Sequence, residues 1–215
     1  VGEEITKRWI TFPIGDVNVT NENNIETEEL HIEEPLAIIY TGGTTGKPKG
    51  VVLSHQSIET NALNTIISWD LSSKDITLTC IPMFHTGGLN ALTIPHLYIG
   101  GTVVILEQFE PEVVIDILDQ YQCTNILMVP TMYHSMIQLT AFKDRKFSSV
   151  HTFLSGGAPC PLPIYEKFQE KGLLFKQGYG LTEAGPNNFY LEPKDAYNKI
   201  GSVGKPMFYN DVKIM

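Results

Sequence analysis

Residues 102–129, TVVILEQFEPEVVIDILDQYQCTNILMV, hold two short apolar runs on either side of one amphipathic segment. The runs at 102–106 and 125–129 have the length and the continuous hydrophobicity of buried strands. Between them, Pro111 suits the first position of a helix. The apolar residues of that helix recur at intervals of three and four: Val113, Val114, Ile117, Leu118 and Tyr121. The order strand, helix, strand predicts a unit of a parallel sheet.

The same alternation continues in both directions along the chain. Further strands are expected at 36–40, 77–81, 152–154 and 173–176, and further helices after Ser54 and at 132–139 and 161–171. Because continuous apolar strands alternate with amphipathic helices, the sequence predicts an α/β fold with a largely parallel sheet flanked by helices on both faces. The helix capped by Ser54 is expected to bury Ile58, Ala62, Leu63, Ile66 and Ile67.

Composition and charge restrict the class of protein. The chain has 215 residues, of which 42% are hydrophobic and 18% charged, as in an ordinary globular domain. A formal charge of −9 argues against a general nucleic-acid or anionic-membrane surface. No apolar run reaches the roughly 18–20 residues of a membrane span. The spacing of Cys80, Cys123 and Cys160 fits neither a disulfide framework nor a zinc site, so we expect a cytoplasmic protein.

The two ends of the chain suggest its organisation. Residues 1–34 are polar and acidic, and we expect a linker or an irregular lead-in there. Residues 35–215 are expected to form one core. The chain starts at Val1 without an initiator Met, and residues 211–215 have the pattern of a strand that has just begun. We therefore expect the chain to be the central part of a longer protein.

Three unusual stretches, at 41–50, 82–88 and 177–186, each follow a predicted strand. In a parallel sheet, ligands bind beyond the carboxyl ends of the strands. The stretch 41–50, TGGTTGKPKG, combines four glycines, three threonines and two lysines. Backbone N–H groups, hydroxyls and cations are the elements of a polyphosphate cradle, although such residues are also common in surface turns. The order of residues does not fit a Walker loop, because Pro48 follows Lys47 where a hydroxyl residue is required.

The other stretches carry aromatic, hydroxyl and carboxylate groups. Residues 177–183, QGYGLTE, could hold a base by stacking and a metal by oxygen, or could form a turn with a satisfied Glu. Residues 156–158, Gly-Gly-Ala, would let a flat ring approach the backbone. Residues 82–88, PMFHTGG, place His85 beside Phe84, where a histidine is more often structural than functional.

These four stretches carry a resemblance to a known family, and it is most specific in two of them. The segment 40–50 strongly resembles the phosphate-loop motif of the adenylate-forming superfamily, Tyr-Thr-Ser-Gly-Thr-Thr-Gly-X-Pro-Lys-Gly, and departs from it only at Gly42, where Ser is usual. The segment 179–183 is similar to the family's Tyr-Gly-X-Thr-Glu motif and follows at a similar distance. This superfamily includes acyl-CoA synthetases, aryl-CoA ligases, luciferases and peptide-synthetase adenylation domains. The resemblance covers nearly all of 36–215.

The resemblance implies a role for each matching residue. Thr41, Thr44, Thr45 and Lys49 would face the β- and γ-phosphates of ATP, and Tyr179 would lie on the adenine ring. The residues that it assigns to the nucleotide are Thr41, Gly42, Gly43, Thr44, Thr45, Gly46, Lys49, Gly156, Gly157, Ala158, Gln177, Gly178, Tyr179, Gly180 and Thr182. Its catalytic set is Thr182 on the α-phosphate, Glu183 as the Mg²⁺ ligand, Lys49, and His85 near the substrate carboxylate.

The activity that the resemblance implies is ATP-dependent conversion of a carboxylic acid to an acyl-adenylate, followed by thioester formation with CoA, as in a fatty acyl-CoA synthetase. Amino-acid-activating members have an Asp where this chain has His85, so the substrate is expected to lack an α-amino group. An aryl or o-succinylbenzoyl-CoA ligase and a non-catalytic nucleotide-binding module remain alternatives. The partners would be the acid, ATP and CoA, with a homodimer possible. The family's ribose-binding Asp and catalytic Lys would lie downstream, so we expect the isolated chain to be inactive.

Overall fold

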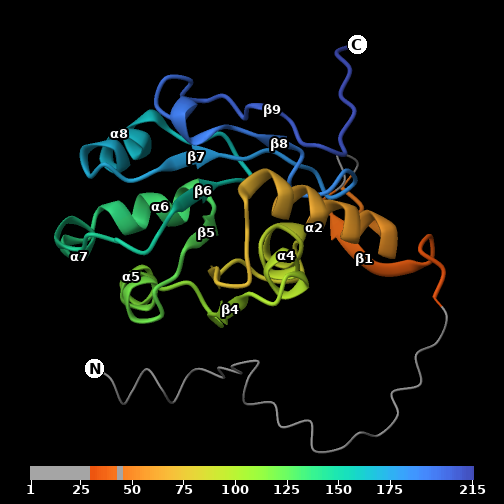
Figure 1. Ribbon diagram of the computed structural model, residues 1–215, viewed down its shortest axis with the longest axis horizontal. Helices are drawn as coiled ribbons and strands as arrows, with labels where there is room; N and C mark the ends of the chain where they lie inside the picture. Colours follow the sequence, from red (N-terminus) through yellow and green to blue (C-terminus); the bar gives the residue numbers. More distant parts are fainter. Residues whose placement is uncertain (1–29, 43–45) are drawn as a thin grey trace, which may run out of the picture.

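The computed structural model describes residues 30–42 and 46–215, and its fold is α/β as predicted (Figure 1). Five parallel strands form one sheet in the order β4-β3-β5-β6-β7. These strands are β3 (Ile76–Thr79), β4 (Thr102–Ile105), β5 (Asn125–Met128), β6 (Thr152–Ser155) and β7 (Phe175–Gln177). Each lies within two residues of its predicted position, so the continuous apolar runs identified the strands correctly.

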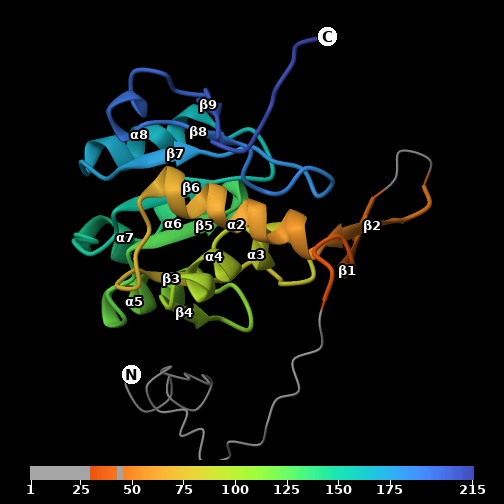
Figure 2. The ribbon, with the colours of Figure 1, turned by 45° about the vertical axis from the view of Figure 1, so that its right-hand side comes forward.

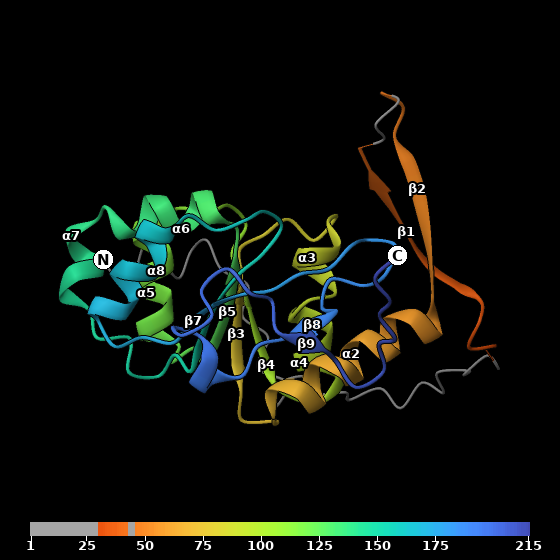
Figure 3. The ribbon, with the colours of Figure 1, turned by 90° about the horizontal axis from the view of Figure 1, so that it is seen from above.

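Helices cover both faces of this sheet. Figure 3 shows α5 (Pro111–Gln120), α6 (Pro130–Ile137), α7 (Thr140–Asp144) and α8 (Leu162–Glu170) on one side. The other side carries α2 (His55–Trp69), α3 (Thr86–Leu89) and α4 (Thr93–Tyr98). A short pair of strands, β8 (Phe189–Tyr190) and β9 (Lys205–Pro206), and the turn η1 (Pro193–Asp195) complete the described chain. None of the helices described here is long and apolar enough to cross a membrane.

The main core lies between the sheet and the layer formed by α5, α6 and α8. Aromatic rings dominate it, and Tyr133 stands edge-on to Phe168 and Phe175 at centroid distances of 5.4 and 4.9 Å. The Tyr133 hydroxyl donates a hydrogen bond to the Leu154 carbonyl at 2.9 Å, so its burial leaves no polar group unpaired. This core fixes β5, β6 and β7 relative to one another.

The segment 35–54 differs from the prediction. The predicted strand at 36–40 exists as β1 (Pro35–Thr41), but it pairs antiparallel with β2 (Lys49–Ser54), which the sequence analysis missed. The two strands form a hairpin that projects from the sheet domain (Figure 3). The described residues of 41–50 therefore belong to this hairpin and do not follow a strand of the five-stranded sheet. A strand and not a helix follows Pro48, which agrees with the exclusion of a Walker loop.

Helix α2 begins as predicted but buries a different face. Ser54 caps it, and its Oγ accepts the Ser57 N–H at 3.1 Å. Ile58 and Ala62 are buried as expected, whereas Ile67 is exposed and Leu63 and Ile66 are only half-buried. The buried positions instead include three polar residues: Asn61, Asn64 and Thr65. The periodicity prediction was wrong here because α2 packs partly against polar loops, whose backbone groups need hydrogen-bonding partners.

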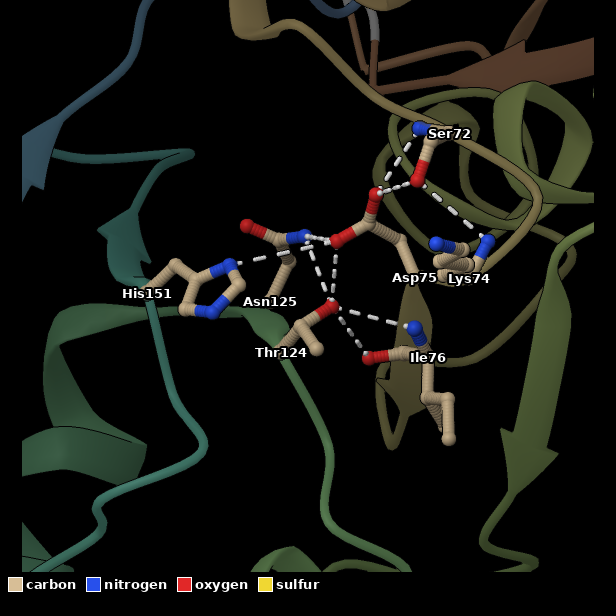
Figure 4. A network of polar contacts seen from close by, with 7 residues as sticks. All are labelled: Ser72, Lys74, Asp75, Ile76, Thr124, Asn125 and His151. Atoms are coloured by element: carbon tan, nitrogen blue, oxygen red, sulfur yellow. Dashed lines mark hydrogen bonds and ion pairs between the residues drawn. The ribbon is translucent and has the colours of Figure 1, made fainter.

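A polar network joins the amino ends of three strands (Figure 4). The buried carboxylate of Asp75 accepts hydrogen bonds from Ser72 N and Oγ at 2.8 and 3.0 Å and from Thr124 Oγ1 at 2.8 Å. Asn125 Nδ2 lies 3.4 Å from it, and His151 Nδ1 lies 4.0 Å away. Burial by itself would raise the pKa of Asp75, but these hydrogen bonds outweigh it and lower the pKa. The network stabilises the edge of the sheet that lies away from the ligand side.

Candidate active site at the carboxyl edge of the sheet

The segments that follow β3, β5, β6 and β7 meet at the carboxyl edge of the sheet and enclose a cavity of about 400 Å³. The segments 82–88, 156–157 and 178–182 therefore lie together, as the sequence predicted for loops after parallel strands. The glycines at the wall are Gly156, Gly157, Gly178 and Gly180, and the apolar side chains are Ile81, Leu127, Val129, Leu154 and Leu181. These glycines and apolar side chains make the wall of the cavity largely apolar.

Two of the glycines pack closely against leucine side chains of the cavity wall. A methyl group on Gly156 would lie 3.2 Å from Leu127 Cδ1, and one on Gly178 would lie 3.3 Å from Leu154 Cδ1. Leu127 and Leu154 belong to β5 and β6 and line the cavity themselves. Side chains at the glycine positions would therefore press on these leucines and narrow the space for a ligand.

The segment 181–185 is a closed turn that carries two of the predicted catalytic residues. The Leu181 N–H donates to the Gly185 carbonyl at 2.9 Å, and Gly185 has a φ of +88°, which favours glycine. Thr182 is half-buried and lines the 400 Å³ cavity. Glu183 is exposed and lines a second cavity of about 300 Å³, which Ser54 and the first two turns of α2 border. The two residues thus face neighbouring cavities from one turn.

His85 lies across the first cavity from this turn. It is exposed and precedes the short helix α3, and its ring centroid lies 4.4 Å from that of Phe84. Thr86, the next residue, lines both cavities. The structure places His85 in the lining of the first cavity, and its contact with a substrate stays a prediction.

Three of the nucleotide residues predicted at 156–182 lie outside the first cavity's lining. Tyr179 is 47% exposed, and its ring stands edge-on to Phe189 at 5.6 Å. Gln177 uses its Oε1 to accept the Cys160 N–H at 2.8 Å, so this oxygen holds the loop after β6. Ala158 is exposed and does not line the cavity. The structure brings Gly156, Gly157, Gly178, Gly180 and Thr182 together, but not these three side chains.

The phosphate-loop residues are separate from both cavities. Thr41 is half-buried, and Gly42, Gly46 and Lys49 are exposed on the hairpin. The predicted residues Gly43, Thr44 and Thr45 lie outside the described residues. No described residue of 41–50 lines either cavity. The hairpin nevertheless leads directly through Ser54 into α2, whose first turns border the cavity that contains Glu183.

The available metal ligands are few. Within the described parts of the chain, no three His, Cys, Asp or Glu side chains come close enough to hold a metal together. Glu183 is therefore a single carboxylate beside hydroxyl and amide groups. Mg²⁺ usually takes one or two carboxylates and completes its octahedral shell with water and phosphate oxygens. The donor set fits a magnesium ion that arrives with a nucleotide, and it does not fit a structural zinc site.

Sequence analysis missed two residues that line both cavities, Thr86 and Asn187. Asn187 is buried, and its Nδ2 donates to Thr65 Oγ1 at 2.9 Å and to the Ala91 carbonyl at 2.8 Å. Its position four residues after Glu183 was the only signal available in the sequence. Thr86 follows His85 directly. Neither type of residue is distinctive enough to be identified without the fold.

The chain is similar to known enzymes over most of its length. The model of the AMP-binding enzyme family matches residues 5–215, and the chain belongs to this family. A feruloyl-CoA synthase from Amycolatopsis sp is 33% identical over 207 residues, which are 96% of this chain and 42% of that protein. An indoleacetate–CoA ligase from Aromatoleum aromaticum is 36% identical over 183 residues, which are 85% of this chain and 36% of that protein.

A solved structure extends the likeness to the fold. The o-succinylbenzoate coenzyme A synthetase from Bacillus subtilis, in complex with ATP and magnesium ion, superposes with a TM-score of 0.75 at 34% identity. The match covers 83% of this chain and 37% of that one. The chain thus spans less than half the length of the relatives that it matches, and the predicted adenylate-forming superfamily is confirmed.

Proposed function

We propose that the protein to which this chain belongs is an AMP-forming acid–thiol ligase, which activates a carboxylic acid with ATP and transfers the acyl group to CoA. The observation that carries the proposal is the convergence of 82–88, 156–157 and 178–182 on one cavity at the carboxyl edge of the sheet. Membership of the AMP-binding family and the likeness to CoA ligases support it. Residues 35–215 would form the central part of the nucleotide-binding core.

Each group of residues is proposed to contact a different part of the substrates. Gly156, Gly157, Gly178 and Gly180 let the nucleotide and the acid approach the backbone. Thr182 would donate its hydroxyl to the α-phosphate from the wall of the first cavity. Tyr179, exposed beside this wall, is free at its surface to stack on a base, and Gln177 holds the loop after β6 through Cys160. Thr41, Thr44, Thr45 and Lys49 would face the β- and γ-phosphates.

Glu183 is proposed as the protein ligand of Mg²⁺. A magnesium ion bound there with ATP would neutralise charge on the phosphate oxygens. The remaining contribution to catalysis comes from the chain's own groups. The Thr182 hydroxyl would donate to the charge that builds on the phosphates, the Lys49 ammonium would add positive charge from the exposed hairpin, and His85 would orient the substrate carboxylate toward the α-phosphate.

The proposed reaction needs no general base in its first step, since a carboxylate with a pKa near about 4–5 is ionised at neutral pH. A carboxylate oxygen attacks the α-phosphorus, the bond from this phosphorus to the bridging oxygen breaks, and pyrophosphate leaves. In the second step the sulfur of CoA attacks the acyl carbon, the bond to the AMP oxygen breaks, and the thiol proton is released. Holding the reactants in line could contribute up to roughly 7–11 kcal/mol.

The substrate is proposed to be an aryl acid, the alternative that the sequence left open beside a fatty acid. Ferulate, indoleacetate and o-succinylbenzoate, the acids in the names of the relatives, all carry an aromatic ring. A planar aryl acid is therefore proposed ahead of a long alkyl chain.

A non-catalytic nucleotide-binding module is the second candidate, and only Gly42 favours it, because one hydroxyl of the usual phosphate loop is missing. ATP–pyrophosphate exchange by the full-length protein, measured with ferulate, indoleacetate, o-succinylbenzoate and fatty acids of several lengths, separates the candidates. Exchange with an aryl acid supports the ligase with an aryl substrate. Exchange with fatty acids alone would overturn the aryl assignment, and none with any acid would favour the module.

A further inference from the structure

One asparagine on α2 bonds to both of the loops that line the candidate site. Asn61 is buried, and its Nδ2 donates to the carbonyl oxygen of Asn90 at 2.7 Å. Its Oδ1 accepts the backbone N–H of Asn187 at 3.3 Å. Asn90 belongs to the segment of His85 and Thr86, and Asn187 directly follows the segment of Thr182 and Glu183. A single amide therefore joins the two sides of the site.

The bond to Asn187 restrains the turn that carries Glu183. Gly185 closes this turn by accepting the Leu181 N–H, and it packs so tightly on Asn61 that a methyl group there would lie 2.9 Å from Asn61 Oδ1. On the other side, a methyl group on Gly180 would overlap the Pro186 carbonyl. The turn thus has little room to move relative to α2.

Thr65, one helical turn after Asn61, supports the same side. Its Oγ1 donates to the Asn61 carbonyl at 2.9 Å and accepts from Asn187 Nδ2 at 2.9 Å. The other proton of that amide group goes to the Ala91 carbonyl at 2.8 Å. All three N–H donors of Asn187 are therefore used to fix its position. Thr65 has no described bond to Asn90, so it acts on the His85 side only through the Asn187 amide, which also bonds to Ala91.

The His85 side is restrained through Asn90. Its Nδ2 donates to Thr86 Oγ1 at 3.0 Å, and its backbone N–H donates to the Thr86 carbonyl at 2.7 Å. A shift of the Asn90 carbonyl would therefore move Thr86, which lines both cavities, and His85 beside it. Asn61 holds this carbonyl at a fixed distance from the Glu183 turn.

We propose that Asn61 is a positioning residue that sets the separation between the acid-orienting His85–Thr86 segment and the metal-binding Thr182–Glu183 turn. This inference rests on the proposed function of those two segments. Adenylation needs the carboxylate and the α-phosphate in line, and a displacement of about 1 Å can cost on the order of 100-fold in rate. Asn61 acts through backbone groups and does not touch the substrates.

The test compares full-length variants with a matched control. Asn61→Ala removes both bonds, and we expect exchange to fall about 10- to 100-fold, with a higher KM for the acid and a higher Mg²⁺ concentration at half-maximal rate. Thr65→Val keeps the side-chain volume and both side-chain bonds of Asn61, so it should shift the Mg²⁺ dependence more than the KM for the acid. The control is Asn125→Ala at the opposite edge of the sheet, an equally buried asparagine bonded to Asp75 and Thr124 (Figure 4). Asn125→Ala should lower the stability of the protein and leave the KM for the acid and the Mg²⁺ dependence unchanged.

Thermal unfolding separates the test of the Asn61 role from the test of the proposed function. The rise in Tm produced by Mg²⁺ and ATP should be smaller in Asn61→Ala and Thr65→Val than in Asn125→Ala, even in a protein that forms no adenylate. If wild-type protein shows no exchange with any acid, the proposed function falls, and the Tm comparison still tests Asn61. The positioning role is wrong if Asn61→Ala matches Asn125→Ala in Tm shift, in the KM for the acid and in Mg²⁺ dependence. If Asn61→Ala does not fold, the same conclusion follows when Thr65→Val matches Asn125→Ala in these measurements.

Discussion

The ammonium of Lys176 lies 4.6 Å from the centre of the Trp69 ring, which joins β7 to the end of α2. Tyr190 lies on its other side at 4.7 Å, and Lys176 is only 3% exposed. Burial lowers the pKa of this ammonium from 10.5 to about 8. The two aromatic faces stabilise the cation, but no carboxylate is paired with it among its described contacts. Lys176 therefore connects the sheet to the layer of α2 and lowers the stability of the folded protein by burying a charge.

Lys176→Met should raise the stability of the full-length protein by about 1–3 kcal/mol at pH 7, because a buried charge is replaced by an apolar side chain of similar length. The folded state releases its proton near pH 8 and the unfolded state near 10.5, so wild-type stability rises with pH between these values. The advantage of the variant is expected to be full below pH 8 and to shrink up to 10.5. Thermal unfolding at a series of pH values measures this.

Lys167→Met is the control for that series, since Lys167 is exposed and pairs with Glu170 at the surface. Its Tm should differ little from wild type at every pH. A Lys176→Met variant that is less stable than wild type at pH 7 would mean that the two cation–π contacts outweigh the burial of the charge.

Gly180→Ala should destroy the turn that carries Thr182 and Glu183. The added methyl group would overlap the carbonyl of Pro186, which is backbone and cannot rotate away. We expect exchange to fall at least about 100-fold, since displacement of the catalytic groups by about 1 Å has an effect of that size. Gly101→Ala, where a methyl group would lie 3.0 Å from the Asp75 carbonyl at the opposite end of the sheet, provides the comparison. Equal exchange rates in the two variants would contradict this account of the turn.

Gly42→Ser restores the hydroxyl that the family's phosphate loop usually has. A side chain at Gly42 would meet nothing within 4 Å, so the substitution should not disturb the hairpin. We expect the KM for ATP to fall about threefold to tenfold, which corresponds to about 0.5–1.5 kcal/mol for one hydrogen bond. Initial rates at varied ATP concentration measure it. An unchanged or higher KM would mean that this position does not face the phosphates.

The sequence predicted the sheet well because apolar runs such as 102–106 and 125–129 have only one stable environment, the buried centre of a parallel sheet. It failed at β2, since Val51–Leu53 is too short to be separated from the loop before it by hydrophobicity alone. It also misplaced the buried face of α2, where Asn61 and Thr65 are inside and Ile67 is exposed. Their burial depends on the loops that they bond, and those loops are distant in sequence.

The residues of the candidate site likewise fall into those that a local motif predicts and those that depend on tertiary packing. Residues of the local motifs, such as Gly178 and Thr182, could be predicted because one short segment carries them. Thr86 and Asn187 could not, because their place in the site depends on how α2 and the loops pack. Gln177 belongs to the motif, yet its side chain holds Cys160 and does not face the cavity. A motif identifies a segment, while tertiary hydrogen bonds decide which of its side chains face the ligand.

The most direct test of the account is ATP–pyrophosphate exchange by full-length Glu183→Gln at varied Mg²⁺, beside Glu166→Gln. The amide keeps the size of Glu183 but removes the charge that would hold the metal. Glu166 is an exposed carboxylate on α8, the helix on the opposite face of the sheet from α2 (Figure 2). The account predicts that exchange by Glu183→Gln falls at least about 100-fold at low Mg²⁺, with partial recovery as Mg²⁺ rises, while Glu166→Gln matches wild type. Wild-type exchange and wild-type Mg²⁺ dependence in Glu183→Gln would contradict it.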